Sequence, residues 1–137
     1  MIREITKDIE ILQQVSKNIN PKEAQRIIKD LLDTAEAHKD RCVGLSDIQI
    51  SEPVRVFVAF TGDRFIPFVN PVITRYLGSV YEADESCMSL EGSRKVSRYE
   101  GVEIMYQRGT KYVKVGYKGF FAEIIQHEMD HLRGKLI

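Results

Sequence analysis

The sequence has no excess of charge of either sign, few cysteines and no long apolar run. Its 137 residues include 20 basic and 20 acidic side chains, so binding to nucleic acid or to an anionic membrane is not expected. Residues 1–8 carry charges where a signal peptide needs an apolar run, and no apolar stretch approaches the length of a membrane span. We therefore expect a soluble, cytoplasmic protein with a small or neutral substrate.

Cysteine is too scarce for a disulfide framework. The chain has only Cys42 and Cys87, which is ordinary for a reduced cytosolic protein and leaves either thiol open to a metal or catalytic role. No linker, repeat or low-complexity segment divides the chain, and its length suits one hydrophobic core. We expect a single domain over residues 1–137.

A long amphipathic helix is predicted in the N-terminal third of the chain. Asn20, Pro21 and Glu23 have the residue types that favour a helix start. Apolar residues then recur at helical spacing, at Ala24, Ile27, Ile28, Leu31, Leu32 and Ala35. This pattern predicts a helix that ends near Lys39, and its apolar stripe favours packing on a core over binding a partner.

The middle of the chain favours antiparallel strands. Residues 54–60 are rich in β-branched and aromatic side chains, and a turn signal follows at residues 61–63. Further short strands are predicted at residues 66–69, 72–76 and 80–83, separated by Asn70-Pro71 and by Gly78. The alternating patterns of residues 102–107 and 111–117 predict a hairpin that turns at residues 108–110.

Helical periodicity returns after Gly119 and ends at Arg133-Gly134. The order of helix, strands and helix indicates an α+β fold. We expect antiparallel β-sheets that pack around the C-terminal helix, with the long amphipathic helix on the N-terminal side.

The C-terminal helix carries the pattern of a metal site. His127 and His131 lie four residues apart, so both imidazoles can face one ion while Glu128 lies beside them. Two imidazoles suit a divalent metal, and the glutamate can take a proton from water and pass it to a leaving group. The pattern predicts metal-assisted hydrolysis, although so short a motif is only suggestive by itself.

Two features strengthen the metal hypothesis against the alternative of a solvated helix end. His127 continues an apolar stripe through Phe120 and Ile124, and polar groups on a buried stripe need partners, which a metal supplies. A catalytic site of this kind usually has three protein ligands. Cys87, just after a predicted strand, is the candidate for the third ligand, unless it is a buried structural thiol.

Three segments resemble the signature motifs of the peptide deformylase family, in the same order along the chain. Residues 126–134, Gln-His-Glu-Met-Asp-His-Leu-Arg-Gly, match the third motif at every defining position. Residues 85–89, Glu-Ser-Cys-Met-Ser, resemble the second motif, E-G-C-L-S, with its cysteine in place. Residues 43–49, Val-Gly-Leu-Ser-Asp-Ile-Gln, resemble the first motif, G-x-G-x-A-A-x-Q, and retain one glycine and the glutamine. The likeness covers nearly the whole chain.

The resemblance implies a metal-dependent hydrolase that removes the formyl group from the N-terminal formyl-methionine of newly made proteins. The metal of that family is Fe(II), which Zn(II), Ni(II) or Co(II) can replace, and the ligands here would be Cys87, His127 and His131. A thiolate with two imidazoles also suits iron or zinc better than calcium or magnesium. Glu128 would be the general base and then the acid. Gln49 and the backbone N–H of Met88 would donate hydrogen bonds to the developing oxyanion.

The resemblance also implies that the partners are formylated N-terminal peptides of nascent proteins. The backbone around Val43, Gly44 and Ser86 would align an extended peptide, and Phe120 and Ile124 would wall the methionine pocket. The sequence ends soon after the third motif, without the basic C-terminal helix that some family members use on the ribosome. Ribosome contact through such a helix is therefore not expected, nor is direct contact with nucleic acid or membrane.

Departures from the motifs leave other hypotheses open. Cys42 replaces the first glycine of the first motif, Ser46 and Asp47 replace its two alanines, and Ser86 replaces the glycine of the second motif. A catalytically weak or inactive protein that binds metal and peptide is therefore an alternative to the enzyme. A general metallopeptidase is a third hypothesis, but it depends on the helix motif alone.

Overall fold

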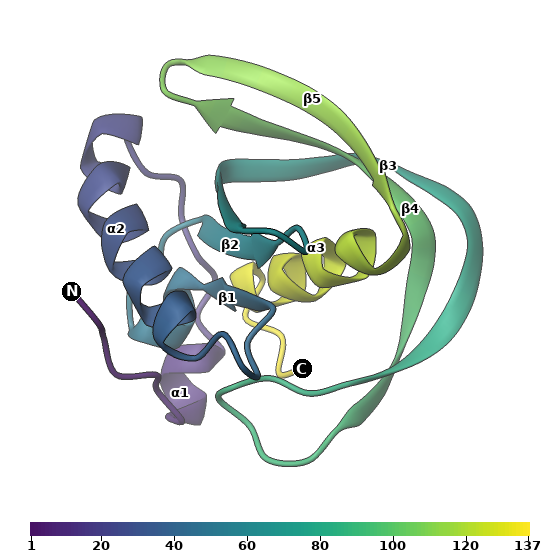
Figure 1. Cartoon of the computed structure of the whole chain (residues 1–137), viewed down its shortest axis with the longest axis horizontal. Helices are drawn as coiled ribbons and strands as arrows, with labels where there is room; N and C mark the ends of the chain where they lie inside the picture. The colour runs from purple at the N-terminus through teal and green to yellow at the C-terminus, as the bar shows by residue number, and fades with distance from the viewer.

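The computed structural model describes all residues, 1–137, as a curved five-stranded antiparallel sheet with helices packed on it (Figure 1). In chain order the elements are α1 (Ile9–Leu12), α2 (Pro21–Ala37), β1 (Gly44–Ser46), the 3-10 helix η1 (Asp47–Ile50), β2 (Val56–Phe60), β3 (Phe65–Glu85), β4 (Arg94–Arg108), β5 (Lys111–Lys118) and α3 (Gly119–Leu132). The strands lie in the order β1-β2-β3-β4-β5. The predicted α+β fold, with an antiparallel sheet around the C-terminal helix, is confirmed, although the strands form one sheet rather than several.

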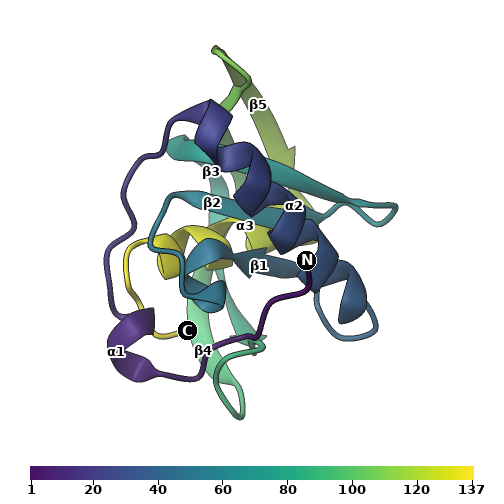
Figure 2. The same cartoon turned by 90° about the vertical axis from the view of Figure 1, so that its left-hand side faces the viewer.

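The N-terminal end of the chain forms only the short helix α1 before the chain reaches α2. Asn20 caps α2, because its side chain accepts a hydrogen bond from the backbone N–H of Lys22 at 2.9 Å, and Pro21 is the first helical residue. Ala24, Leu31 and Ala35 of α2 are completely buried. In the view of Figure 2, α2 lies in front of β1 and β2, with α3 behind them.

Strand β2 is apolar throughout because helices cover both of its faces. Successive side chains of a strand point to opposite faces. Phe57 and Ala59 accordingly belong to the core around α3, whereas Val56 and Val58 belong to the core beneath α2. Strand β2 therefore lies between two hydrophobic cores, one beneath α2 and one around α3, the helix that carries the histidines.

The prediction of three separate strands at residues 66–69, 72–76 and 80–83 was wrong, because one long strand, β3, spans this region. Asn70-Pro71 and Gly78 fall at irregularities in the pairing of β3 with β4. A bulge tolerates a proline without an N–H and a residue with a left-handed backbone, such as Asn70 (φ 49°) or Gly78 (φ 76°). Bulges also bend a strand. These residues therefore help β3 curve around α3, at the positions where strand ends were predicted (Figure 1).

The predicted hairpin between residues 102–107 and 111–117 is confirmed. Strands β4 and β5 pair as far as Arg108 and Lys111, and Gly109 in the turn has φ 61°. The turn predicted at residues 61–63 likewise joins β2 to β3, which pair from Phe60 and Phe65. No helix is both long and apolar enough to cross a membrane.

Strand β1 and the helix η1 were not predicted. β1 pairs with β2 alone, so its other edge has no neighbouring strand. It also packs against α3, since Gly44 faces the side chains of Ile124 and Glu128. An open strand edge thus lies beside the helix that carries the histidines.

Candidate metal centre

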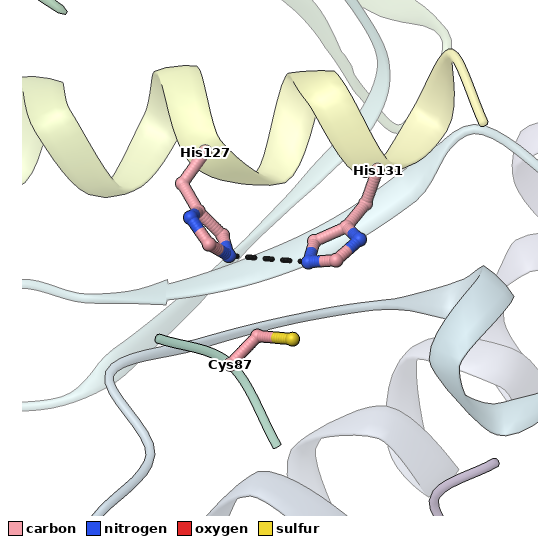
Figure 3. Close-up of side chains that lie close together, drawn as sticks. All are labelled: Cys87, His127 and His131. Carbon is pink, nitrogen blue, oxygen red and sulfur yellow. Dashed lines mark hydrogen bonds between the residues drawn. The ribbon is translucent and has the colours of Figure 1, made fainter. Parts of the chain in front are cut away.

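Helix α3 and the segment after β3 bring together the three side chains that were predicted as metal ligands, Cys87, His127 and His131. His127 and His131 project from the same side of α3, and their Nε2 atoms lie 3.1 Å apart. In Figure 3 both rings point toward Cys87, which lies across the gap from the helix. One possible ligand atom from each residue lies within 4.8 Å of the other two, so a single ion can contact all three.

A buried ion-pair network fixes His127. The Nδ1 atom of its ring lies 2.7 Å from a carboxylate oxygen of Glu85, which leaves Nε2 to face the other ligands. Arg98 donates to both oxygens of Glu85, at 2.7 and 2.9 Å, and to Asp130 at 2.7 Å. All four side chains are buried. The network therefore joins α3 to both strands of the long β3–β4 hairpin.

The protonation states of the three predicted ligands depend on one another, and a metal ion would displace the proton of His127 and bind the thiolate of Cys87. Burial lowers the pKa of His127, but hydrogen bonds to Cys87 and Glu85 outweigh burial and raise the pKa to about 9. Burial raises the pKa of Cys87, but hydrogen bonds with His127 and with the backbone of Ser89 and Leu90 lower it, which favours the thiolate. Burial, together with the positive charge of His127, lowers the pKa of His131 to about 3, so this imidazole is neutral. A thiolate and imidazoles in this setting are the donor set of a divalent transition metal.

Glu128 is buried beside the two histidines, and its Oε1 atom has no hydrogen-bond partner. Burial raises its pKa to about 7, even though the positive charge of His127 and the hydroxyl of Ser46 favour the charged form. A carboxyl group of this pKa can both accept and release a proton near neutral pH. Gly44 leaves room for this carboxylate, since a Cβ at that position would lie 2.6 Å from Glu128 Oε2.

Gln49 is held in one orientation by two serines. Its Oε1 atom accepts hydrogen bonds from the backbone N–H of Ser46 at 3.0 Å and from the Ser46 hydroxyl at 3.2 Å. Its Nε2 atom donates to the hydroxyl of Ser89 at 3.1 Å. Only 1 % of Gln49 is exposed. One N–H of its amide therefore remains for a further acceptor.

A cavity of about 820 Å³ opens beside His127 and Glu128, a size that suits a small ligand. The predicted substrate residues all line it: Val43, Gly44, Ser86, Phe120 and Ile124. Of the two predicted oxyanion donors, Met88 lines the cavity and Gln49 does not. Ile124 is buried. Phe120 is 62 % exposed, so the expectation that it continues a buried stripe was wrong. It lies in the first turn of α3, where it borders this cavity and a second, smaller one.

Sequence reasoning missed the residues that support the centre. Glu85 and Ser89 flank Cys87 in the second motif-like segment, so their positions offered a signal that was assigned no role. Arg98 offered no signal, because a charged residue within an alternating strand ordinarily faces solvent. Its role follows from tertiary contacts with Glu85 and Asp130.

Asp47, which stands where the first motif has an alanine, is the first residue of the buried helix η1. Its side chain is completely buried, and neither carboxylate oxygen has a hydrogen-bond partner. Burial raises the pKa of Asp47 well above its ordinary value. Burial therefore favours the protonated, neutral form of this side chain.

Comparison with known proteins gives a consistent result. The family model for polypeptide deformylase matches residues 2–137. The chain is 43% identical over 138 aligned positions to a peptide deformylase of Clostridium beijerinckii, with 100% of both chains covered. It is 39% identical over 130 positions to a peptide deformylase of Pelotomaculum thermopropionicum, which covers 92% of this chain and 82% of the relative.

Solved structures agree with the sequence comparisons. The crystal structure of peptide deformylase from Thermotoga maritima superposes with a TM-score of 0.89 at 26% identity, and covers 99% of this chain and 95% of that one. A class I type b peptide deformylase from Acinetobacter baumannii with bound Met-Ala-Ser superposes with a TM-score of 0.84 at 26% identity. That comparison covers 99% of this chain and 97% of the other.

Proposed function

This chain belongs to the peptide deformylase family and is a deformylase, and we propose that Cys87, His127 and His131 bind its metal while Glu128 transfers the protons of the reaction. The proposal depends above all on the convergence of these three side chains, whose ligand atoms lie within 4.8 Å of one another. The substrate is the formamide at the N-terminal formyl-methionine of a newly made protein. Its hydrolysis yields formate and a free amine.

Glu128 moves the protons between water and the leaving amine. A bound divalent cation supplies a Lewis acid for the formyl group and lowers the pKa of water. Glu128 takes a proton as the water oxygen attacks the formyl carbon, and then delivers it to the amine nitrogen as the C–N bond breaks. Burial suits this double role, because it holds the pKa of Glu128 at about 7.

The open edge of β1 aligns the peptide. Val43, Gly44 and Ser86 line the cavity, and the outer edge of β1 has no partner strand. An extended peptide adds to such an edge through main-chain hydrogen bonds. Ile124 walls the pocket for the methionine side chain, and Phe120 stands at its exposed mouth.

Two donors stabilise the oxyanion that forms from the formyl group. The remaining N–H of the Gln49 amide is one of them, and the backbone N–H of Met88 is the other. Donors that are already oriented act without reorganisation during the reaction. We propose Fe(II) as the metal, with Zn(II), Ni(II) or Co(II) as substitutes, because a thiolate and two imidazoles suit these ions.

Formate release from formyl-Met-Ala-Ser tests this function directly. The protein is loaded anaerobically with Fe(II), and separately with Zn(II), so that the assay also ranks the metals. Glu128→Gln keeps the size of the side chain but removes the base, and kcat should fall by about 10²–10⁴-fold with metal content unchanged. No release of formate with any metal would refute the function, and an unimpaired Glu128→Gln variant would refute the role of Glu128.

The same assay bears on the two alternatives. A protein that only binds would hold formylated peptide without releasing formate, but relatives named peptide deformylase do not favour this alternative. A general metallopeptidase would cleave internal bonds of unformylated peptides. We expect no such cleavage.

A further inference from the structure

The hydroxyl of Ser46 lies at the junction of strand β1 and helix η1, deep inside the protein. Ser46 is completely buried and precedes the first residue of η1. Gly44, two residues earlier on β1, faces the carboxylate of Glu128. The strand that carries Ser46 thus runs directly beside the proposed general base.

Ser46 holds one end of the Gln49 side chain. Its backbone N–H and its hydroxyl lie 3.0 and 3.2 Å from Gln49 Oε1. Because a backbone N–H can only donate, the amide oxygen must face it. The hydroxyl adds a second donor to the same oxygen, which makes rotation of the amide more costly and polarises its N–H groups.

The other end of the amide is tied to the cysteine segment. Gln49 Nε2 donates to the hydroxyl of Ser89 at 3.1 Å, and Ser89 lies two residues after Cys87 in the sequence. This bond uses one of the two N–H groups. The amide is therefore held at both ends, and the direction of its free N–H is determined by the two serines.

We propose that Ser46 is a positioning residue for deformylation, whose buried hydroxyl fixes the Gln49 amide so that its free N–H meets the developing oxyanion. This inference rests on the proposed function, in which Gln49 is an oxyanion donor. In the motif that this segment resembles, the position is alanine, which has no hydroxyl to offer. Ser46 is thus a substitution within the motif that supports the site.

Ser46→Ala tests the proposal, with Ser16→Ala as the matched control. Ser16 is also buried, but its hydroxyl has no hydrogen-bond partner. For Ser46→Ala we expect kcat for formyl-Met-Ala-Ser to fall about fivefold to tenfold, the usual effect of one lost hydrogen bond. KM should not change, because Ser46 acts through Gln49 and not on the peptide. Ser16→Ala should leave both parameters unchanged, and thermal melts of both variants verify folding.

A double-mutant cycle separates positioning from a structural effect. Gln49→Leu removes the amide, so adding Ser46→Ala to that variant should cause no further fall in kcat. The Ser46 hydroxyl also favours the charged form of Glu128, and an effect through Glu128 would instead persist after the amide is removed. An equal fall in both backgrounds, or unchanged kcat in Ser46→Ala when Gln49→Leu is impaired, would overturn the role of Ser46 and leave the proposed function intact. A wild-type protein that releases no formate would overturn both.

Discussion

Two buried polar regions of this protein differ in how their polar side chains are paired. In the ion-pair network around Glu85 and Arg98, every charged side chain lies within 3 Å of an oppositely charged partner. The β1–η1 segment, residues 44–50, is just as deeply buried, but its carboxyl group, Asp47, has no partner at all. The side chains of Ser46 and Gln49 are instead balanced by neutral hydrogen bonds, to each other and from Gln49 to Ser89.

The difference shows where the protein depends on charge and where it depends on close packing. Removing one member of a buried ion pair leaves an uncompensated charge, so the network around His127 tolerates little change. The β1–η1 segment instead buries the Asp47 carboxyl group without a partner, which favours its neutral form and costs stability. Substitutions at the metal centre, which the network supports through His127, should therefore have different consequences from substitutions in the β1–η1 segment, and the following variants test that expectation.

The largest effect is expected at the metal centre, from Cys87→Ala. Loss of the thiolate leaves two imidazoles, so metal content should fall sharply. Activity should fall on the order of a thousandfold or more. This is larger than the roughly 10–100-fold loss that follows when a residue that hydrogen-bonds to a metal ligand is changed. Elemental analysis and formate release measure the two effects.

Cys42→Ala is the matched control, because Cys42 is also a free cysteine that lines the cavity. Its thiol contacts the carbonyl oxygen of Gly44 at 3.3 Å and is not part of the Cys-His-His cluster. The Cys42→Ala variant should therefore retain its metal. Loss of metal from both variants alike would contradict the assignment of Cys87 as the ligand.

A smaller effect is expected where the β1–η1 segment touches the centre. In Gly44→Ala the new Cβ would lie 2.6 Å from Glu128 Oε2 and 2.9 Å from a methyl group of Ile124. Since displacement of a catalytic group by about 1 Å can cost about a hundredfold, kcat should fall about tenfold to a hundredfold. Gly116→Ala is the control, because nothing lies within 4 Å of its Cβ position. Equal kcat for both variants would show that close packing at Gly44 is unimportant.

The smallest effect is expected from Asp47→Ala, and it should be a gain in stability. Burial raises the pKa of Asp47 well above 3.8, so above pH 3.8 the folded chain keeps a proton that the unfolded chain has lost. The free energy of unfolding therefore falls as pH rises toward the folded-state pKa. At pH 7 the variant should be more stable by about 1–3 kcal/mol, because a buried polar group without a partner has been removed.

Chemical denaturation at pH 7 and below pH 3.8 measures this effect. The stabilisation should shrink at the lower pH, where both states of the wild-type protein carry the proton. Asp63→Ala, in the exposed turn after β2, should change stability little at either pH. If Asp47→Ala instead destabilises the protein at pH 7, the Asp47 carboxyl group has a hydrogen-bond or ion-pair partner within the folded protein.

Several features of the fold and the site were predictable because they depend on local geometry. The four-residue spacing of His127 and His131 puts both rings on one side of any α-helix. The cap at Asn20 and the alternating pattern across Gly109 likewise act over a few residues. The continuity of β3 was not predictable, because bulges at Asn70-Pro71 and Gly78 give the same sequence signals as strand ends.

By itself, then, the sequence determined the helix with its histidine pair and, through motif resemblance, pointed to Cys87, Glu128 and Gln49. Only the tertiary structure decided that Arg98 would join Glu85 to Asp130, that Ser46 would hold Gln49 and that Asp47 would be buried without a partner. The physical reason is the distance along the sequence over which each interaction acts. Helical periodicity and capping act within a few residues, whereas burial and pairing of polar groups depend on elements that meet only when the chain folds.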